Sequence, residues 1–83
     1  MTQESILEKI REIVIDYVGP DSKIQVTMES RLREDLTLDS MDILYVVFVV
    51  ENTFSISVNN QQMAGLKTVA DLVKVVQEKC KKN

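Results

Sequence analysis

A serine with acidic neighbours, Ser40 between Asp39 and Asp42, is the place in this sequence where side chains could take part in chemistry. The chain has no histidine, so the base that usually makes a serine nucleophilic is missing. No Gly-x-Ser-x-Gly elbow of the kind found in serine hydrolases surrounds Ser40. We therefore expect no catalytic residue here, and we interpret the Ser40 hydroxyl as a site on which another enzyme acts.

Two simpler roles for these residues have to be weighed. Asp35, Asp39 and Asp42 could suggest a metal site, but they lack the central glycine and terminal glutamate spacing of an EF-hand loop. We interpret them as capping residues and surface charge, and we expect no bound metal. Ser40 could itself be a helix cap, as serines often are. Asp39 can supply that cap, which leaves the hydroxyl of Ser40 free.

The elements that must position Ser40 are predicted to be helices. Apolar residues spaced three and four apart predict an amphipathic first helix, which Gly19 and Pro20 end. This stripe consists of Ile6, Leu7, Ile10, Ile13, Val14 and Tyr17. A long loop follows from Asp21 to Asp39, and long loops in small domains are usually functional. Isolated apolar residues could pin this loop to the core: Ile24, Val26, Met28, Leu32, Leu36 and Leu38.

The segment after Ser40 is ambiguous by local rules. Residues 43–50 are rich in β-branched and aromatic side chains and could form a buried strand. Asp39 as N-cap and Asp42 three residues later favour a helix, which runs through Phe54 without a turn signal. Its core face is predicted to hold Ile43, Val46, Val47, Val50 and Phe54. Met41, Leu44 and Phe48 form a second stripe, which is either a surface patch for a partner or part of a helix buried all round.

Residues 59–63 are predicted to form a short helix before Gly65. Thr68 with Asp71 is a capping box for a last helix, whose buried stripe is Val69, Leu72, Val73 and Val76. The predicted fold is all-α: a small four-helix bundle with three main helices, a short third helix and a long loop after helix one. Residues 1–83 form a single domain, too small for a core and a deep enclosed active site together.

Composition excludes several function classes. The formal charge is −3, and residues 34–51 contain five acids with no lysine or arginine, which argues against a nucleic-acid partner. Cys80 is the only cysteine, so no intramolecular disulfide is possible; its role is open. The apolar run is too short to span a bilayer, and no export signal is evident. We expect a monomer located in the cytoplasm.

The segment Glu34-Asp35-Leu36-Thr37-Leu38-Asp39-Ser40-Met41-Asp42 resembles the phosphopantetheine attachment motif of acyl carrier proteins, commonly Glu-Asp-Leu-Gly-x-Asp-Ser-Leu-Asp. Thr37 stands where the family usually has glycine, and Met41 where it usually has leucine. The resemblance extends to the Gly19 stop, to Phe54 closing helix two and to the start of the last helix at Thr68. It implies a four-helix bundle that carries acyl groups as thioesters on a 4'-phosphopantetheine arm.

The resemblance also implies the site residues and the partners. Ser40 would carry the arm, which a holo-carrier synthase (a phosphopantetheinyl transferase) transfers from coenzyme A with magnesium, and Asp39 would assist that modification. A phosphodiester is favoured at a helix N-terminus by free N–H groups and the helix dipole. Other partners would be enzymes that load and process the acyl group. The residues expected to contact partners are Met41, Asp42, Leu44, Tyr45, Phe48 and Glu51.

The sequence departs from the family pattern in its acidity. Tyr45 and the stretch from Asn59 to Gln62 occupy positions where acids are frequent in the family. The pathway is therefore either fatty-acid synthesis or a specialised acyl or polyketide-type synthesis. The alternative from another class is a helical protein-interaction module without a prosthetic group, which would use Met41, Leu44 and Phe48 to bind a partner helix.

Overall fold

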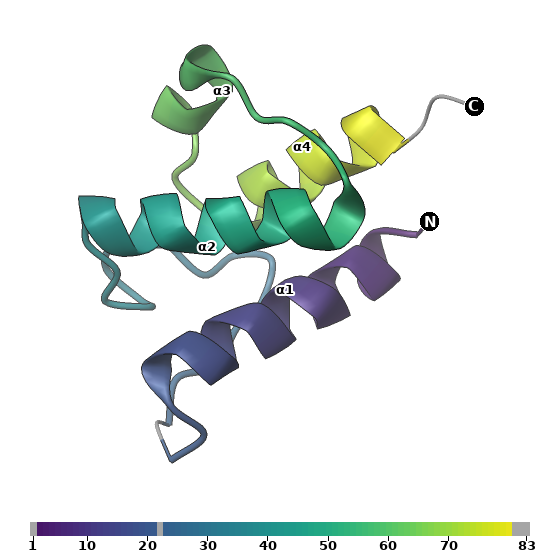
Figure 1. Cartoon of the computed structure of the whole chain (residues 1–83). Helices are drawn as coiled ribbons and strands as arrows, with labels where there is room; N and C mark the ends of the chain where they lie inside the picture. Colours follow the sequence, from purple (N-terminus) through teal and green to yellow (C-terminus); the bar gives the residue numbers. More distant parts are fainter. Residues whose placement is uncertain (1, 22, 81–83) are drawn as a thin grey trace.

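The computed structural model describes residues 2–21 and 23–80 and contains four helices (Figure 1). They are α1 (Gln3–Val18), α2 (Ser40–Phe54), the short α3 (Asn60–Ala64) and α4 (Val69–Cys80). Within the described residues, the one β-type pairing is an isolated antiparallel bridge between Arg31 and Thr68. The all-α prediction, the short third helix and the helical assignment of residues 43–50 are confirmed. None of the described helices is long and apolar enough to cross a membrane.

Helix α1 is capped at its start by Thr2 and ends at Gly19, the end that the sequence predicted. The Thr2 side chain accepts a hydrogen bond from the Ser5 N–H at 3.1 Å, and the helix stops at Gly19, whose φ of 108° suits a residue without a Cβ. Ile6, Ile10 and Val14 are buried, but Tyr17 is 42 % exposed. Tyr17 belongs to the apolar stripe but stays at the surface, because the last turn of α1 meets the surface of α2, where its ring stacks on that of Tyr45 with centroids 5.0 Å apart.

The long loop between α1 and α2 is held to the core by apolar side chains. Val26, Leu32, Leu36 and Leu38 are buried, and Ile24 and Met28 pack against the core while partly exposed, as the sequence predicted. Arg11 of α1 also donates from Nε and Nη2 to the Val26 carbonyl at 3.2 and 3.1 Å. Such a loop has a defined path, so the residues that precede Ser40 have defined positions.

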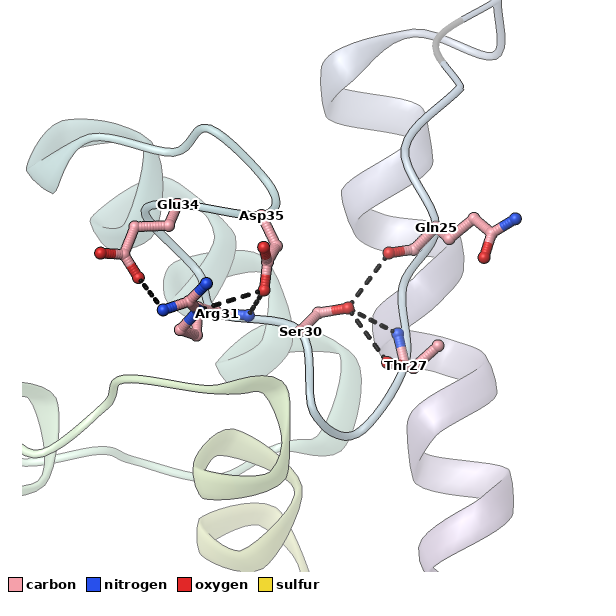
Figure 2. A network of polar contacts seen from close by, with 6 residues as sticks. All are labelled: Gln25, Thr27, Ser30, Arg31, Glu34 and Asp35. Carbon is pink, nitrogen blue, oxygen red and sulfur yellow. Dashed lines mark hydrogen bonds and ion pairs between the residues drawn. The ribbon is translucent and has the colours of Figure 1, made fainter.

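Ser30 organises the middle of this loop (Figure 2). Its buried hydroxyl donates to the Gln25 carbonyl at 3.1 Å and accepts from the Thr27 N–H at 2.9 Å. The loop is also joined to the start of α4: the Leu32 N–H donates to the Lys67 carbonyl and the Val69 N–H donates to the Ser30 carbonyl, both at 2.9 Å. Buried polar groups need such partners, and these bonds fix the loop against α4.

The remaining helices close the core. Helix α1 packs against both α2 and α4, and Gln3 at the start of α1 donates to Gln77 near the end of α4 at 3.1 Å. Figure 1 shows the start of α1, the end of α2 and the end of α4 on the same side of the molecule. Thr68 and Asp71 form the predicted capping box through bonds of 3.0 and 3.3 Å. The predicted stripe of α4 is buried throughout: Val69, Leu72, Val73 and Val76.

Phe54 is less buried than the sequence predicted. Ile43, Val46, Val47 and Val50 of α2 are buried, whereas Phe54 packs against the core from its edge and stays partly exposed. The reason is its position at the last residue of α2, where Ser55 adopts the left-handed conformation and turns the chain away. A truncation of Phe54 should therefore cost less than the roughly 3 to 5 kcal/mol typical of a fully buried phenylalanine.

Candidate functional site: the serine at the start of α2

Ser40 is the first residue of α2, and its side chain is exposed. Asp39 is the N-cap: its carboxylate accepts from the Asp42 N–H at 2.9 Å, while the Asp42 carboxylate accepts from the Asp39 N–H at 3.0 Å. This reciprocal capping box was predicted and is confirmed. Because Asp39 already supplies the cap, the hydroxyl of Ser40 is not needed for capping.

The Ser40 hydroxyl has a partner that sequence reasoning missed. Arg33 Nη2 donates to Ser40 Oγ at 2.9 Å from a position seven residues earlier in the loop. The charged residues of the segment 34–51 are all acids, and Arg33 lies just outside that segment. An arginine close before the acidic run was the available signal. The side chain of Ser40 is therefore held by a cation rather than by a base.

Thr37 shapes the turn that leads into Ser40. Its φ of 55° lies in the left-handed region, where glycine is favoured and a β-branched residue is strained by about 1 to 2 kcal/mol. The Thr37 hydroxyl donates to the Leu36 carbonyl at 2.6 Å. This conformation explains why a glycine stands here in the motif that the sequence resembles, and it shows that the turn keeps its shape without one.

Glu34 and Asp35, which precede Ser40 in the loop, both pair with Arg31 (Figure 2). Arg31 forms ion pairs with Glu34 at 2.9 Å and with Asp35 at 3.4 Å. The Arg31 backbone N–H donates to Asp35 at 2.8 Å, and this bond is the main cause of the lowered pKa of Asp35. In the described residues, no group of three or more acidic or cysteine side chains could hold a metal ion. Asp35 thus belongs to a loop-stabilising network.

Asp42 links the start of α2 to the end of α1, a contact that the sequence did not reveal. The Tyr17 hydroxyl donates to the Asp42 carboxylate, which also accepts from the Asp39 N–H. The bond from Tyr17 is the first cause of the lowered pKa of Asp42, and the Asp39 N–H adds to it; the same bond raises the pKa of Tyr17. Asp42 is therefore occupied in holding α1 beside the helix start that presents Ser40.

The apolar residues predicted to contact partners form an exposed surface on α2. The exposed fractions are 73 % for Met41, 53 % for Leu44, 50 % for Tyr45 and 59 % for Phe48. We call these four residues the apolar face of α2. A helix buried all round, the alternative considered for this stripe, is excluded. Together with Val58 and Met63, these residues line a surface groove between α2 and α3.

Glu51 lies at the end of this groove but is not a free surface charge. Its carboxylate accepts a hydrogen bond from the Val58 N–H at 2.7 Å, and its side chain is half-buried. The bond fastens the segment after α2 to the helix. Asp42 and Glu51 are thus both engaged in hydrogen bonds within the chain, while the apolar side chains face outward.

The residues around Ser40 suit an attached phosphate. An exposed hydroxyl is available, the first turn of α2 leaves backbone N–H groups without helical partners, and the guanidinium of Arg33 lies next to the hydroxyl oxygen. A second hollow beside the serine is lined by Arg33, Ser40, Ile43, Asn60, Met63, Ala64, Leu66 and Lys67. The chain itself provides no histidine as a base, so this arrangement can present a hydroxyl and bind an anion but does not resemble a hydrolase centre.

Comparisons with known proteins agree with this geometry. A family model described as "Phosphopantetheine attachment site" matches residues 8–76. An acyl carrier protein of Phytoplasma australiense is 34 % identical over 73 residues, which cover 88 % of this chain and 95 % of that protein. An acyl carrier protein of Streptococcus pyogenes is 36 % identical over 77 residues, covering 93 % and 99 % of the two chains.

Solved structures show the same fold. The crystal structure of an acyl carrier protein from Thermotoga maritima matches with a TM-score of 0.82 and 25 % identity, covering 95 % of this chain and 91 % of that one. A structure of an acyl carrier protein from Enterococcus faecalis matches with a TM-score of 0.74 and 24 % identity, covering 95 % and 99 %.

Proposed function

Because the chain belongs to the acyl carrier protein family, we propose that it carries acyl intermediates as thioesters on a 4'-phosphopantetheine arm attached to Ser40. The observation that supports Ser40 most strongly is its position: an exposed hydroxyl at the first residue of α2, with the cap supplied by Asp39 and Asp42. When bound, the arm supplies the thiol on which the acyl group is held. The chain is then a substrate of enzymes and not an enzyme itself.

The neighbours of Ser40 have distinct parts in this proposal. Asp39 and Asp42 hold the first turn of α2 in place, so the hydroxyl stays exposed to a modifying enzyme. Asp39 is itself exposed, and we assign it the assisting role that the family resemblance implies, at the magnesium site of the holo-carrier synthase. Tyr17 fixes this helix start to α1 through its bond to Asp42. We propose that residues 1–83 form a single acyl carrier domain.

The proposed partners are a holo-carrier synthase and enzymes that load, modify and unload the acyl group. They would contact the apolar face of α2, with Asp42 and Glu51 at its edges. The internal bonds of Glu34, Asp35, Asp42 and Glu51 support a docking mode based on apolar contact more than on charge. Docking through apolar contact favours a specialised acyl or polyketide-type pathway over general fatty-acid synthesis. We also propose that the protein is a monomer located in the cytoplasm.

Intact mass spectrometry tests this function. The purified chain is incubated with coenzyme A, magnesium and a promiscuous phosphopantetheinyl transferase, together with the variants Ser40→Ala and Ser57→Ala. Ser57 is an exposed serine between α2 and α3 and serves as the matched control. We expect the wild type and Ser57→Ala to gain the mass of one arm and Ser40→Ala to gain none. A mass gain in Ser40→Ala would contradict the assignment, and no gain in the wild type would favour an interaction module without a prosthetic group.

A further inference from the structure

Arg33 lies next to Ser40 and takes no part in the ion pairs of the described residues. Arg31, two residues earlier, is paired with both Glu34 and Asp35. Among the ion pairs of the described residues none involves Arg33; its guanidinium donates instead to the uncharged Ser40 hydroxyl at 2.9 Å. A full positive charge that contacts only a neutral oxygen is a weakly matched pair, and an anion at the same place would match it better.

The position of Arg33 follows from how the loop is held. The N–H of Leu32 donates to the carbonyl of Lys67, and Arg31 and Thr68 form the isolated bridge. These bonds bring the loop and the segment before α4 side by side, so Arg33 and Lys67 come to line the same hollow as Ser40. Two cations from distant parts of the sequence therefore line the hollow that also contains Ser40, and one of them, Arg33, contacts its hydroxyl.

We propose that Arg33, assisted by Lys67, binds the phosphodiester through which the arm is attached to Ser40; this inference rests on the function proposed above. Attachment would turn the Ser40 oxygen into an ester oxygen, a poorer acceptor, and would bond it to a phosphorus atom whose non-bridging oxygens carry the negative charge. The planar guanidinium of Arg33 can donate two parallel hydrogen bonds to such oxygens, whereas Lys67 adds a point charge. The arm would then leave the protein on the Arg33 and Lys67 side of α2, restrained by an ion pair that salt weakens.

A purely structural role for Arg33 is the competing explanation. In that case its bond to Ser40 would only hold the loop against α2, and attachment of the arm would displace it into solvent. The two roles differ in whether the phosphate is paired with a guanidinium. The test must therefore observe the phosphorus atom directly and not only the stability or the modification rate.

The test is ³¹P NMR of the intact holo protein, for the wild type and the variants Arg33→Met, Arg33→Lys and Arg31→Met. Arg31→Met is the matched control, because it removes the same charge from the same loop without touching Ser40. We expect the phosphodiester resonance of Arg33→Met to move away from that of the wild type, with Arg33→Lys in between and Arg31→Met unchanged. High salt should move the wild-type resonance toward that of Arg33→Met. An exposed charge pair predicts about a two- to fivefold change in the ratio of paired to free phosphate.

The possible outcomes separate the role of Arg33 from the carrier function itself. If the arm is present but the resonance and its salt dependence are the same in the wild type, Arg33→Met and Arg31→Met, the phosphate does not pair with Arg33 and the inference is wrong. If Arg31→Met shifts the resonance as much as Arg33→Met does, the effect is one of general loop charge, and the specific role of Arg33 is equally excluded. Absence of any phosphodiester signal in the wild type would instead contradict the carrier function itself.

Discussion

The two faces of α2 carry similar apolar side chains in opposite environments. Ile43, Val46, Val47 and Val50 form the face that packs into the core, where each is at most 8 % exposed. The apolar face formed by Met41, Leu44, Tyr45 and Phe48 is at least half exposed. Burial makes the first face responsible for stability, whereas exposure leaves the second available for recognition. The comparison shows that composition alone does not separate these roles; the packing of α1 against one side of α2 does.

Truncation on each face should separate the two roles most clearly. Val50→Ala removes fully buried methyl groups and should lower the free energy of unfolding by about 2 to 3 kcal/mol, including the cavity that it leaves. Phe48→Ala should change it by less than about 0.5 kcal/mol, because the ring is largely in solvent. Urea denaturation of both variants measures this contrast. Equal losses of stability would show that the exposed face contributes to folding stability as much as the buried face does.

Partner binding should show the reverse order. Phe48→Ala should weaken binding to a cognate enzyme by about 2 kcal/mol, as expected for a central aromatic contact, whereas Glu51→Gln should cost less than about 1 kcal/mol. Glutamine at position 51 can still accept the Val58 N–H, so the fold is preserved in that control. Calorimetric titrations at low and high salt measure both effects. A larger loss for Glu51→Gln, with wild-type affinity erased by salt, would mean that charge dominates docking.

A smaller effect is expected in the turn that leads to α2. Thr37→Gly should raise the free energy of unfolding by about 0.5 to 1 kcal/mol, because relief of the left-handed strain exceeds the entropy that glycine adds to the unfolded chain. Thermal and urea unfolding measure the change. Thr37→Ala serves as the control, since alanine keeps the Cβ and should bring no such gain. A destabilised glycine variant would show that the Thr37 hydroxyl bond to Leu36 matters more than the strain.

The smallest effect concerns the contact between Tyr17 and Asp42. In Tyr17→Phe the pKa of Asp42 should rise toward its ordinary value of 3.8, because the hydrogen bond that chiefly lowers it is gone. A lowered pKa in the folded state contributes stability above 3.8, and this contribution is lost as the pH falls through the lower folded-state pKa. The stability difference between wild type and variant should therefore shrink in acid.

Carboxyl NMR titration of Asp42 measures this pKa, with Asp71 as the internal control. Burial on its own would raise the pKa of Asp71, but hydrogen bonds from the N–H groups of Lys67 and Thr68 outweigh it and lower the pKa. Tyr17 takes no part in those bonds, so Asp71 should titrate alike in both proteins. An unchanged Asp42 titration would show that the Tyr17 contact does not persist in solution.

Local features of this fold were predictable, and features that depend on the path of the loop were not. The caps at Asp39 and at Thr68 follow from residues three positions apart, so the sequence contains all the information needed. The contact of Arg33 with Ser40 depends on how the loop is fastened to α4, and the contact of Tyr17 with Asp42 joins residues 25 positions apart. The partial exposure of Phe54 depends on the left-handed conformation of Ser55. A glycine at this position would have indicated such a turn, but the sequence has a serine there.

Direct localisation of the arm tests the central claim that Ser40 is its attachment site. The wild-type chain, modified with coenzyme A and a phosphopantetheinyl transferase, is digested, and the modified peptide is fragmented by mass spectrometry. We expect a single modified peptide in which the fragment ions place phosphopantetheine on Ser40 and on no other serine. Attachment at a different serine, or a chain that is folded and remains unmodified, would contradict the account.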